Sequence, residues 1–214
     1  MPPTSSTCCA RADRPRPWRR VTGTFGVVVA VAASFALRDP LSSMATYTAA
    51  LMVLNQVAPP LLLAALPPRR LAGHERAIAI LFDPWIATAV FVGLSTAVGF
   101  PGILDPTLAN ALYAAPLGLF MLIAGVLFWG QIFPATQSLR TPWQVALLAW
   151  GGSIPMTVVA LVWMLAPDVI YTPYLDVICR WDIPPLADQK WAGFVMFVAG
   201  VPLQIAAAWR LVTA

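Results

Sequence analysis

The chain has 214 residues, of which 59% are hydrophobic and 10% charged, and its formal net charge is +4 at pH 7. Soluble globular domains carry roughly 25% charged residues, and a chain of this length cannot bury so much apolar surface inside one water-soluble core. The composition excludes an ordinary soluble protein. It predicts an all-α integral-membrane bundle.

Long stretches without charge predict six transmembrane helices, because each stretch is close to the roughly 20 residues that cross a bilayer. The stretches lack the alternation of barrel strands, so helices must satisfy the backbone hydrogen bonds within lipid. In chain order the expected spans are Val21–Leu37, Met44–Leu66, Ala77–Phe100, Leu108–Phe133, Trp143–Ala166 and Trp191–Val212. Residues 1–20 are expected to form a flexible basic cytoplasmic tail, and residues 21–214 a single transmembrane domain.

Positive charges predict the orientation of these spans. Ten of the 13 Lys and Arg residues fall before the first span, after even-numbered spans, or at the end of the last one. Cytoplasmic loops are enriched in Lys and Arg, so both termini are expected in the cytoplasm of a bacterial cell, with the spans in its inner membrane. Basic residues spread along one membrane face contact anionic lipid, which argues against nucleic acid as a partner.

Polar residues within the spans are mostly amides. A transporter of protons or ions is expected to place ionisable groups inside its helices, but only Asp83 comes near one, at the cytoplasmic end of the third span. The amides are therefore expected to form hydrogen bonds between helices; they are Asn55, Gln56, Gln131 and Gln204. Pro59, Pro60 and Pro155 are expected to distort the second and fifth spans.

Asp188 and Gln189 lie where the last span begins, on the expected outer face. One interpretation is an ordinary helix start, in which a carboxylate interacts with the positive end of the helix dipole. The other is a polar lock, in which both side chains cap unpaired N–H groups of neighbouring helix ends.

A family resemblance accompanies this pair. The segment "PPLADQKWAGFVMFVAG" resembles the Asp-Gln-x-x-Ala-Gly-x-x-Met-Trp segment of the CtaG-type cytochrome c oxidase assembly proteins, with Phe197 in place of the Trp. Four other similar segments follow the family order within residues 47–200: "VAPPLLLAALP", "FDPWIATAVF", "GVLFW" and "IYTPYLDV". The resemblance implies a helical membrane protein that helps to mature a haem-copper oxidase, by delivering copper through histidines near the outer surface.

The chain departs from the family at those histidines. Aligned on the shared segments, the family's ligand positions fall on Tyr47, Leu51, Gly99, Ala114 and Gly118. None of these residues offers an imidazole, so no metal is expected at the family site. The single histidine, His74, lies in an Arg-rich loop and is expected to be solvated.

Sulfur is the alternative source of copper ligands, since thioethers and thiolates bind Cu(I). The candidates are Met44, Met52, Met121, Met196 and Cys179. Met44 and Met52 are two helical turns apart, and methionines in packed helices usually fill space. Packing is therefore the favoured interpretation, and no cofactor is expected.

No catalytic constellation or phosphate-binding loop is present in the sequence, so the chain is not expected to be an enzyme. The favoured function is assembly or stabilisation of a haem-copper oxidase without direct copper ligation. The alternatives are a permanent accessory subunit of a respiratory or other membrane complex and, less favoured, a small transporter.

Overall fold

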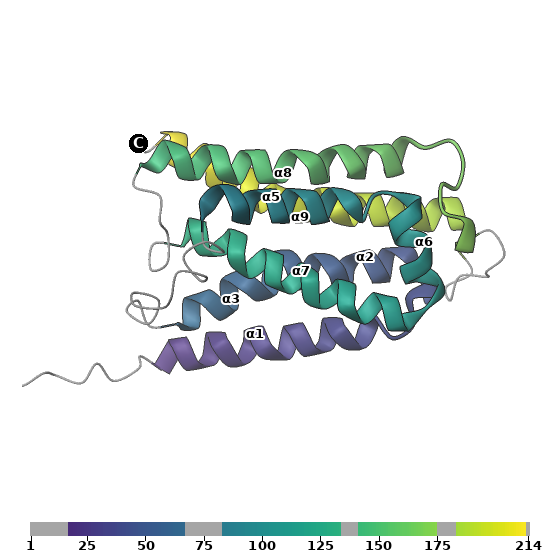
Figure 1. Ribbon diagram of the computed structural model, residues 1–214, viewed down its shortest axis with the longest axis horizontal. Coiled ribbons are helices and arrows are strands. Elements are labelled where there is room, and N and C mark those ends of the chain that lie inside the picture. The colour runs from purple at the N-terminus through teal and green to yellow at the C-terminus, as the bar shows by residue number, and fades with distance from the viewer. Residues whose placement is uncertain (1–16, 67–82, 134–140, 175–182, 213–214) are drawn as a thin grey trace, which may run out of the picture.

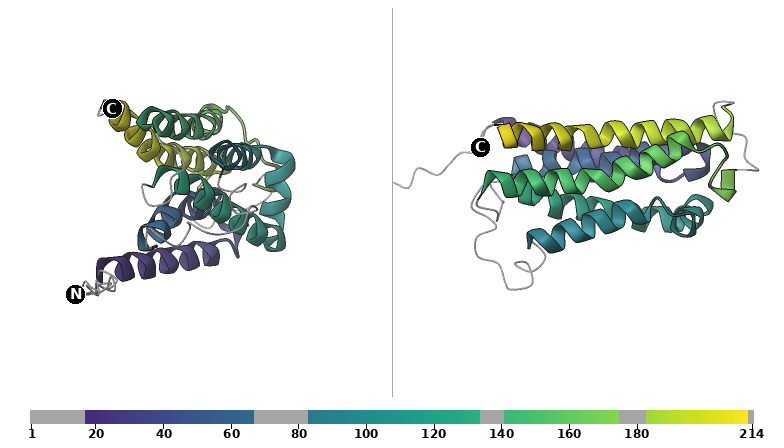
Figure 2. Two further views of the ribbon diagram at one scale, coloured as in Figure 1. Left: turned by 60° about the vertical axis from the view of Figure 1, so that its left-hand side comes forward. Right: turned by 90° about the horizontal axis from the view of Figure 1, so that it is seen from above.

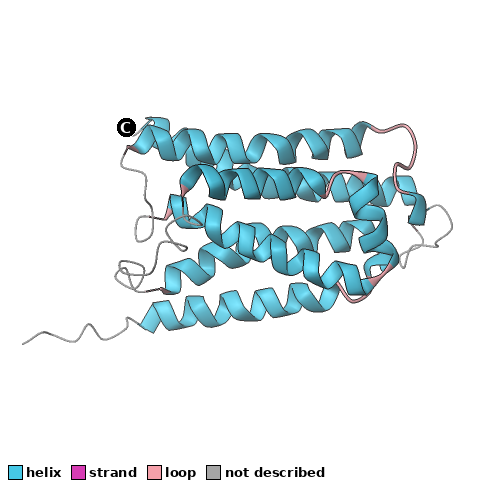
Figure 3. Ribbon diagram, viewed as in Figure 1, coloured by secondary structure: helices cyan, strands magenta, loops and turns pink. Residues whose placement is uncertain are grey.

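The computed structural model describes residues 17–66, 83–133, 141–174 and 183–212, and within these ranges the regular structure is helical (Figure 3). The α-helices are α1 (Pro17–Ala36), α2 (Met44–Met52), α3 (Ala58–Ala65), α5 (Pro84–Ala97), α6 (Pro101–Ala109), α7 (Ala111–Ile132), α8 (Pro142–Leu165) and α9 (Pro185–Val212). Short helices η1 (Pro40–Ser42) and η3 (Thr172–Tyr174) are 3-10 turns, and η2 (Val53–Val57) is a π-helical turn.

The long helices run side by side, with α1 along one edge of the bundle and α8 along the opposite edge (Figure 1). Among the described residues, five helical segments are long and apolar enough to cross a membrane, and a sixth results if the bent pair α5 and α6 is counted as one span. The prediction of an all-α membrane bundle with about six spans is therefore confirmed. The start of α1 and the end of α9 lie at the same end of the bundle (Figure 1), as an even number of spans requires.

Two helices begin earlier than the charge-free stretches predict. Helix α1 begins at Pro17 rather than Val21, so residues 17–20 of the expected flexible tail are helical, while residues 1–16 lie outside the described part. Helix α9 begins at Pro185 rather than Trp191. In both cases the first residue is a proline, which suits the first turn because its missing N–H would have no partner there. Charged residues near helix ends are compatible with a helix that extends beyond the apolar stretch.

The third and fourth expected spans also need correction. Helix α5 ends at Ala97, and the chain turns by 71° into α6, which occupies residues that the sequence assigned to a loop and to the start of the fourth span. Helix α7 begins at Ala111, where the Asn110 side chain accepts a hydrogen bond from Leu112 N (2.9 Å). Residues 77–82 of the expected third span lie outside the described residues.

The second span is one helix with a π-helical turn in its middle. The distortion expected at Pro59 and Pro60 precedes them, as η2, and the two prolines occupy the first turn of α3. Gly125 of α7 lies against this segment: a Cβ added there would be 2.5 Å from the backbone oxygen of Asn55 and 2.6 Å from Pro59 Cγ. Helix α8, by contrast, continues through Pro155.

Helices α8 and α9 form the closest pair, and they lie side by side in both views of Figure 2. A Cβ added at Gly193 of α9 would be 2.8 Å from the backbone oxygen of Ala160 in α8. The small residue thus permits close approach of the two backbones, which is how membrane helices pack in the absence of a hydrophobic driving force.

Candidate functional site

Asp188 lies in the first turn of α9, yet its carboxylate binds the start of α2. Oδ2 accepts a hydrogen bond from Met44 N (2.6 Å), and Oδ1 accepts one from Ser43 Oγ (2.8 Å) and one from Ala45 N (3.2 Å). Ser43 is the N-cap residue of α2 and accepts from Thr46 N (3.2 Å). The three first N–H groups of α2 are therefore satisfied, two of them by a side chain from a helix more than 140 residues away.

Gln189 joins α9 to a different part of the bundle. Its Oε1 accepts a hydrogen bond from Ile170 N (2.8 Å), in the segment after α8, and its Nε2 donates to Trp163 O (3.5 Å) near the end of α8. Asp188 and Gln189 are only 3% and 1% exposed. Adjacent residues thus hold α2 on one side and the end of α8 on the other.

Two tyrosines extend this polar network at the same end of the bundle. The Tyr171 hydroxyl donates to Gly99 O (2.9 Å), and its ring meets that of Trp163 edge-on at 5.4 Å between centroids. Burial raises the pKa of Tyr171, outweighing the hydrogen bond with Trp163 that lowers it, so the hydroxyl keeps its proton. The Tyr47 hydroxyl donates to Thr107 Oγ1 (3.1 Å) on α6.

Helix α6 is fixed from the other side by a further contact. Thr172 Oγ1 donates to Asp105 Oδ2 (2.8 Å), which connects η3 to α6. The bent segment between α5 and α7 is therefore tied to both α2 and the segment after α8.

The family's ligand positions hold groups that do not fit a metal ion. Tyr47, Leu51 and Ala114 are each 0–1% exposed, and the Tyr47 hydroxyl is occupied by Thr107. A Cβ at Gly118 would overlap Leu37 Cδ1, and one at Gly99 would lie 2.8 Å from Val159 Cγ1. Apolar side chains thus fill the space that larger ligands at the two glycines would need.

The sulfur candidates are packed in the core. Met44, Met52, Met121 and Met196 are at most 3% exposed. Met121 Sδ accepts a hydrogen bond from Asn55 Nδ2 (3.2 Å). His74 and Cys179 lie outside the described residues. Within the described ranges, no group of three or more His, Cys, Asp or Glu residues is placed to hold a metal ion.

The amides inside the spans make contacts of different kinds. Asn55 also donates to Ser95 Oγ (3.4 Å) on α5, Gln56 donates to Met156 Sδ (3.2 Å) on α8, and Gln204 donates to Thr157 Oγ1 (3.0 Å) across α8 and α9. Gln131 donates to Leu127 O (3.4 Å) in its own helix. Asp83 caps α5 by accepting from Trp85 N (3.0 Å) and Ile86 N (3.2 Å).

Sequence reasoning missed Ser43, Ser95, Met156 and Tyr171. A Ser followed by an apolar run is a helix-start signal that identifies Ser43, whereas nothing local marks the other three residues as polar contacts.

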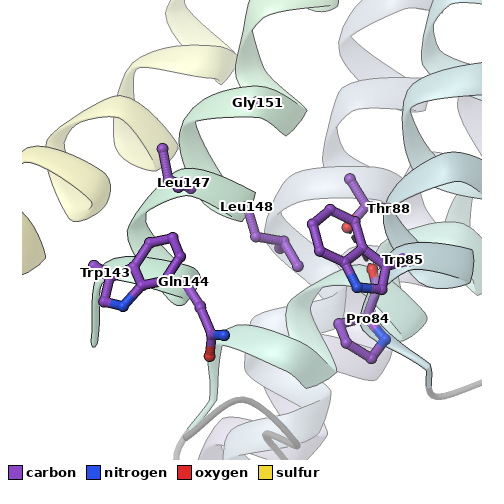
Figure 4. A pocket seen from close by; sticks show the side chains of 8 residues that line it. All are labelled: Pro84, Trp85, Thr88, Trp143, Gln144, Leu147, Leu148 and Gly151. Carbon is purple, nitrogen blue, oxygen red and sulfur yellow. Dashed lines mark hydrogen bonds between the residues drawn. The ribbon is translucent and has the colours of Figure 1, made fainter. Parts of the chain in front are cut away.

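A largely apolar groove of about 340 Å³ lies at the opposite end of the bundle, between the N-terminal turns of α5 and α8 (Figure 4). Its lining consists of Pro84, Trp85, Thr88, Trp143, Gln144, Leu147, Leu148 and Gly151. Among the described residues, this lining includes no ionisable side chain.

The fold and its buried polar network define a multi-pass helical membrane protein in which Asp188 and Gln189 bind other parts of the same chain. Residues 7–214 match the model of one family, the cytochrome c oxidase caa3 assembly factor (Caa3_CtaG). The chain belongs to this family. No curated protein and no solved structure matches the chain.

Proposed function

We propose that this protein assists the assembly or stabilisation of a haem-copper respiratory oxidase in a bacterial inner membrane, without itself binding copper at the family's ligand positions. The family supports the oxidase as the target. The observation that carries the second half is the filling of those positions: Leu51 is buried, Tyr47 is hydrogen-bonded to Thr107, and Gly118 faces Leu37.

The polar network that includes Asp188, Gln189, Tyr47 and Tyr171 supports a scaffolding role. Asp188 and Gln189 match the family segment, and their side chains accept hydrogen bonds from Met44 N and Ile170 N respectively. Both side chains thus have hydrogen-bond partners within the bundle in a chain whose family ligand positions hold no metal-binding group. The hydrogen bonds of Asp188 and Gln189 hold the helices together without a metal ion. This arrangement fits a protein that binds partner subunits and lipid.

Deletion of the gene tests the proposal. The deletion strain is expected to lose spectrally detectable haem-copper oxidase, and a plasmid copy of the chain is expected to restore it. Added copper should fail to restore the oxidase, because the proposed role is not copper supply. Recovery with copper alone would contradict the second half of the proposal, and an oxidase that is unaffected by the deletion would contradict the first.

Metal analysis of the purified protein gives an independent test. In a variant with Cys8, Cys9 and Cys179 changed to Ser, less than about 0.1 copper per chain is expected, because the side chains at the family's ligand positions offer no imidazole or thiolate group. About one copper per chain, lost when Met52, Met121 or Met196 is changed to Leu, would show that a sulfur site exists.

A permanent accessory subunit is the second candidate, since the exposed apolar face of α1, which includes Phe25, Val28 and Phe35, fits a partner helix as well as lipid. Copurification separates the two roles. A subunit would remain with the mature complex at a fixed ratio, whereas an assembly factor would be found only with incomplete intermediates.

A further inference from the structure

Three polar or polarisable side chains meet about one helical turn deeper in the bundle than the family's ligand positions. Asn55 in η2 follows Leu51 by four residues, Ser95 in α5 precedes Gly99 by four, and Met121 in α7 follows Gly118 by three. The three side chains touch: Asn55 Nδ2 donates to Ser95 Oγ (3.4 Å) and to Met121 Sδ (3.2 Å). They are 0%, 1% and 0% exposed.

One buried polar atom of this cluster has no hydrogen-bond partner among the described residues. An amide side chain has two donors and one carbonyl acceptor, and both donors of Asn55 are used, while its Oδ1 is buried with no partner among the described residues. A 180° rotation of the amide, which exchanges Oδ1 and Nδ2, does not satisfy the side chain. The oxygen would then face the Met121 sulfur, which cannot donate, and the NH₂ group would lack acceptors. Either orientation leaves a buried polar atom that needs a ligand.

The Ser95 hydroxyl supplies the second half of a site. Its oxygen accepts from Asn55, and its hydrogen has no recorded acceptor within the described ranges. Ser153, equally buried in α8, differs because its hydroxyl donates to Trp150 O (2.7 Å) in its own helix. Asn55 thus offers a free acceptor beside a free donor on Ser95.

We propose that Asn55 and Ser95 bind one buried water molecule, which donates to Asn55 Oδ1 and accepts from the Ser95 hydroxyl. A buried water needs two to four polar partners, and these two groups meet the minimum. The site adjoins the π-helical turn, where the regular backbone pattern is interrupted and where ordered water commonly completes the hydrogen bonding of membrane helices.

The chemistry of the ligands favours water over a metal ion. All three side chains are neutral, and the site lies in the middle of a membrane span, where an uncompensated charge is strongly disfavoured. The one thioether, Met121 Sδ, already accepts an N–H hydrogen bond. A neutral molecule that both donates and accepts fits this arrangement.

Selective labelling makes the site observable, because the chain has only two asparagines, Asn55 and Asn110. In protein labelled with ¹⁵N-asparagine and held in nanodiscs of deuterated lipid, the Asn55 NH₂ group should show a cross-peak to water by nuclear Overhauser spectroscopy. Asn110, whose side chain is exposed at the start of α7, provides the internal reference for contact with bulk water. A visible Asn55 signal without a water cross-peak would overturn the proposal.

Substitution of the serine tests whether its hydroxyl is a ligand of the water. The cross-peak of Asn55 should be lost or strongly weakened in Ser95→Ala, because the water would keep only one polar partner, below the minimum of two. It should be unchanged in the matched control Ser153→Ala. A cross-peak that is unchanged in Ser95→Ala would show that Ser95 does not bind the water, and the proposal would fail.

Silver(I), a soft monovalent probe, tests the metal alternative. Addition of one equivalent should leave the Asn55 signals in place. A saturable shift of those signals at one equivalent, absent in Met121→Leu, would assign the site to a soft cation and overturn the proposal of water.

Discussion

At the scale of single residues, the Asp188 carboxylate belongs to one helix and completes another. Helix α9 does not need it, because Pro185 has no N–H and the N–H groups of Ala187 and Asp188 bond to Pro184 O. Its oxygens instead accept from Ser43, Met44 and Ala45. The negative charge therefore lies at the N-terminal ends of two helices at once, where both helix dipoles favour it.

Removal of this carboxylate should be costly. Asp188→Ala would leave the buried N–H group of Met44 and the partly buried N–H group of Ala45 without their partner, and the loss is expected to be about 1–3 kcal/mol of stability. Asp188→Asn should cost less, because it keeps one capping oxygen. Thermal unfolding in nanodiscs measures this order, with Asp168→Ala as the control since Asp168 is exposed at the same end of the bundle.

Two results would change this interpretation. An Asp188→Ala protein as stable as the parent would remove the structural role of the carboxylate. If that protein also failed to support oxidase assembly, Asp188 would belong to a surface that contacts the oxidase.

At the scale of helices, hydropathy predicts that the spans exist but not how they begin or bend. The apolar interiors of α7 and α8 could be predicted because lipid demands long apolar segments. The start of α9 at Pro185 could not, since a charge count excludes Asp188 and Lys190, although both fit within the first two turns of the helix. Pro59 and Pro60 predict a distortion of the second span, but they do not predict its form, a π-helical turn at Asn55 that lies against Gly125 of α7.

The candidate site could be predicted only in part, because the local sequence does not show which distant residues meet in the fold. The sequence singles out Asp188 and Gln189 by their position, but their partners Ser43 and Trp163 are distant along the chain and are chosen by packing.

Gly125 tests the contact between α7 and the π-helical turn. In Gly125→Ala the new methyl group would lie 2.5 Å from the Asn55 backbone oxygen, which cannot move without disrupting η2, so a loss of about 1–3 kcal/mol is expected. Gly93→Ala is the matched control, because a Cβ there meets nothing within 4 Å. The control should be neutral or stabilising by up to about 1 kcal/mol from helix propensity. Equal stability of the two variants in nanodiscs would contradict the close packing.

At the scale of the whole molecule, the two ends of the bundle have different characters. The end that holds the starts of α2, α7 and α9 carries the buried polar network, in which α6 is tied to its neighbours through Tyr47 and Thr172. The end that holds the starts of α5 and α8 carries the apolar groove between Trp85 and Trp143 (Figure 4). The bundle is thus cross-linked most densely at the end that the distribution of arginines assigns to the outer face.

The orientation itself can be tested with the chain's own cysteines. In the sequence, Cys179 lies between α8 and α9 and position 70 follows α3, and both lie outside the described residues. The end of α8 and the start of α9 lie at the end of the bundle that carries the polar network, whereas α3 ends at the same end as the start of α1 (Figure 1). If the positive-inside distribution sets the topology, a membrane-impermeant thiol reagent added to intact cells should label native Cys179 and should not label Arg70→Cys in a Cys179→Ser background. Cys8 and Cys9, before α1, should also stay unlabelled until the membrane is permeabilised. Labelling of position 70 with protection of Cys179 would mean that the bundle is inverted, and the polar network would then face the cytoplasm, where it could not lie beside the outer surface of an oxidase.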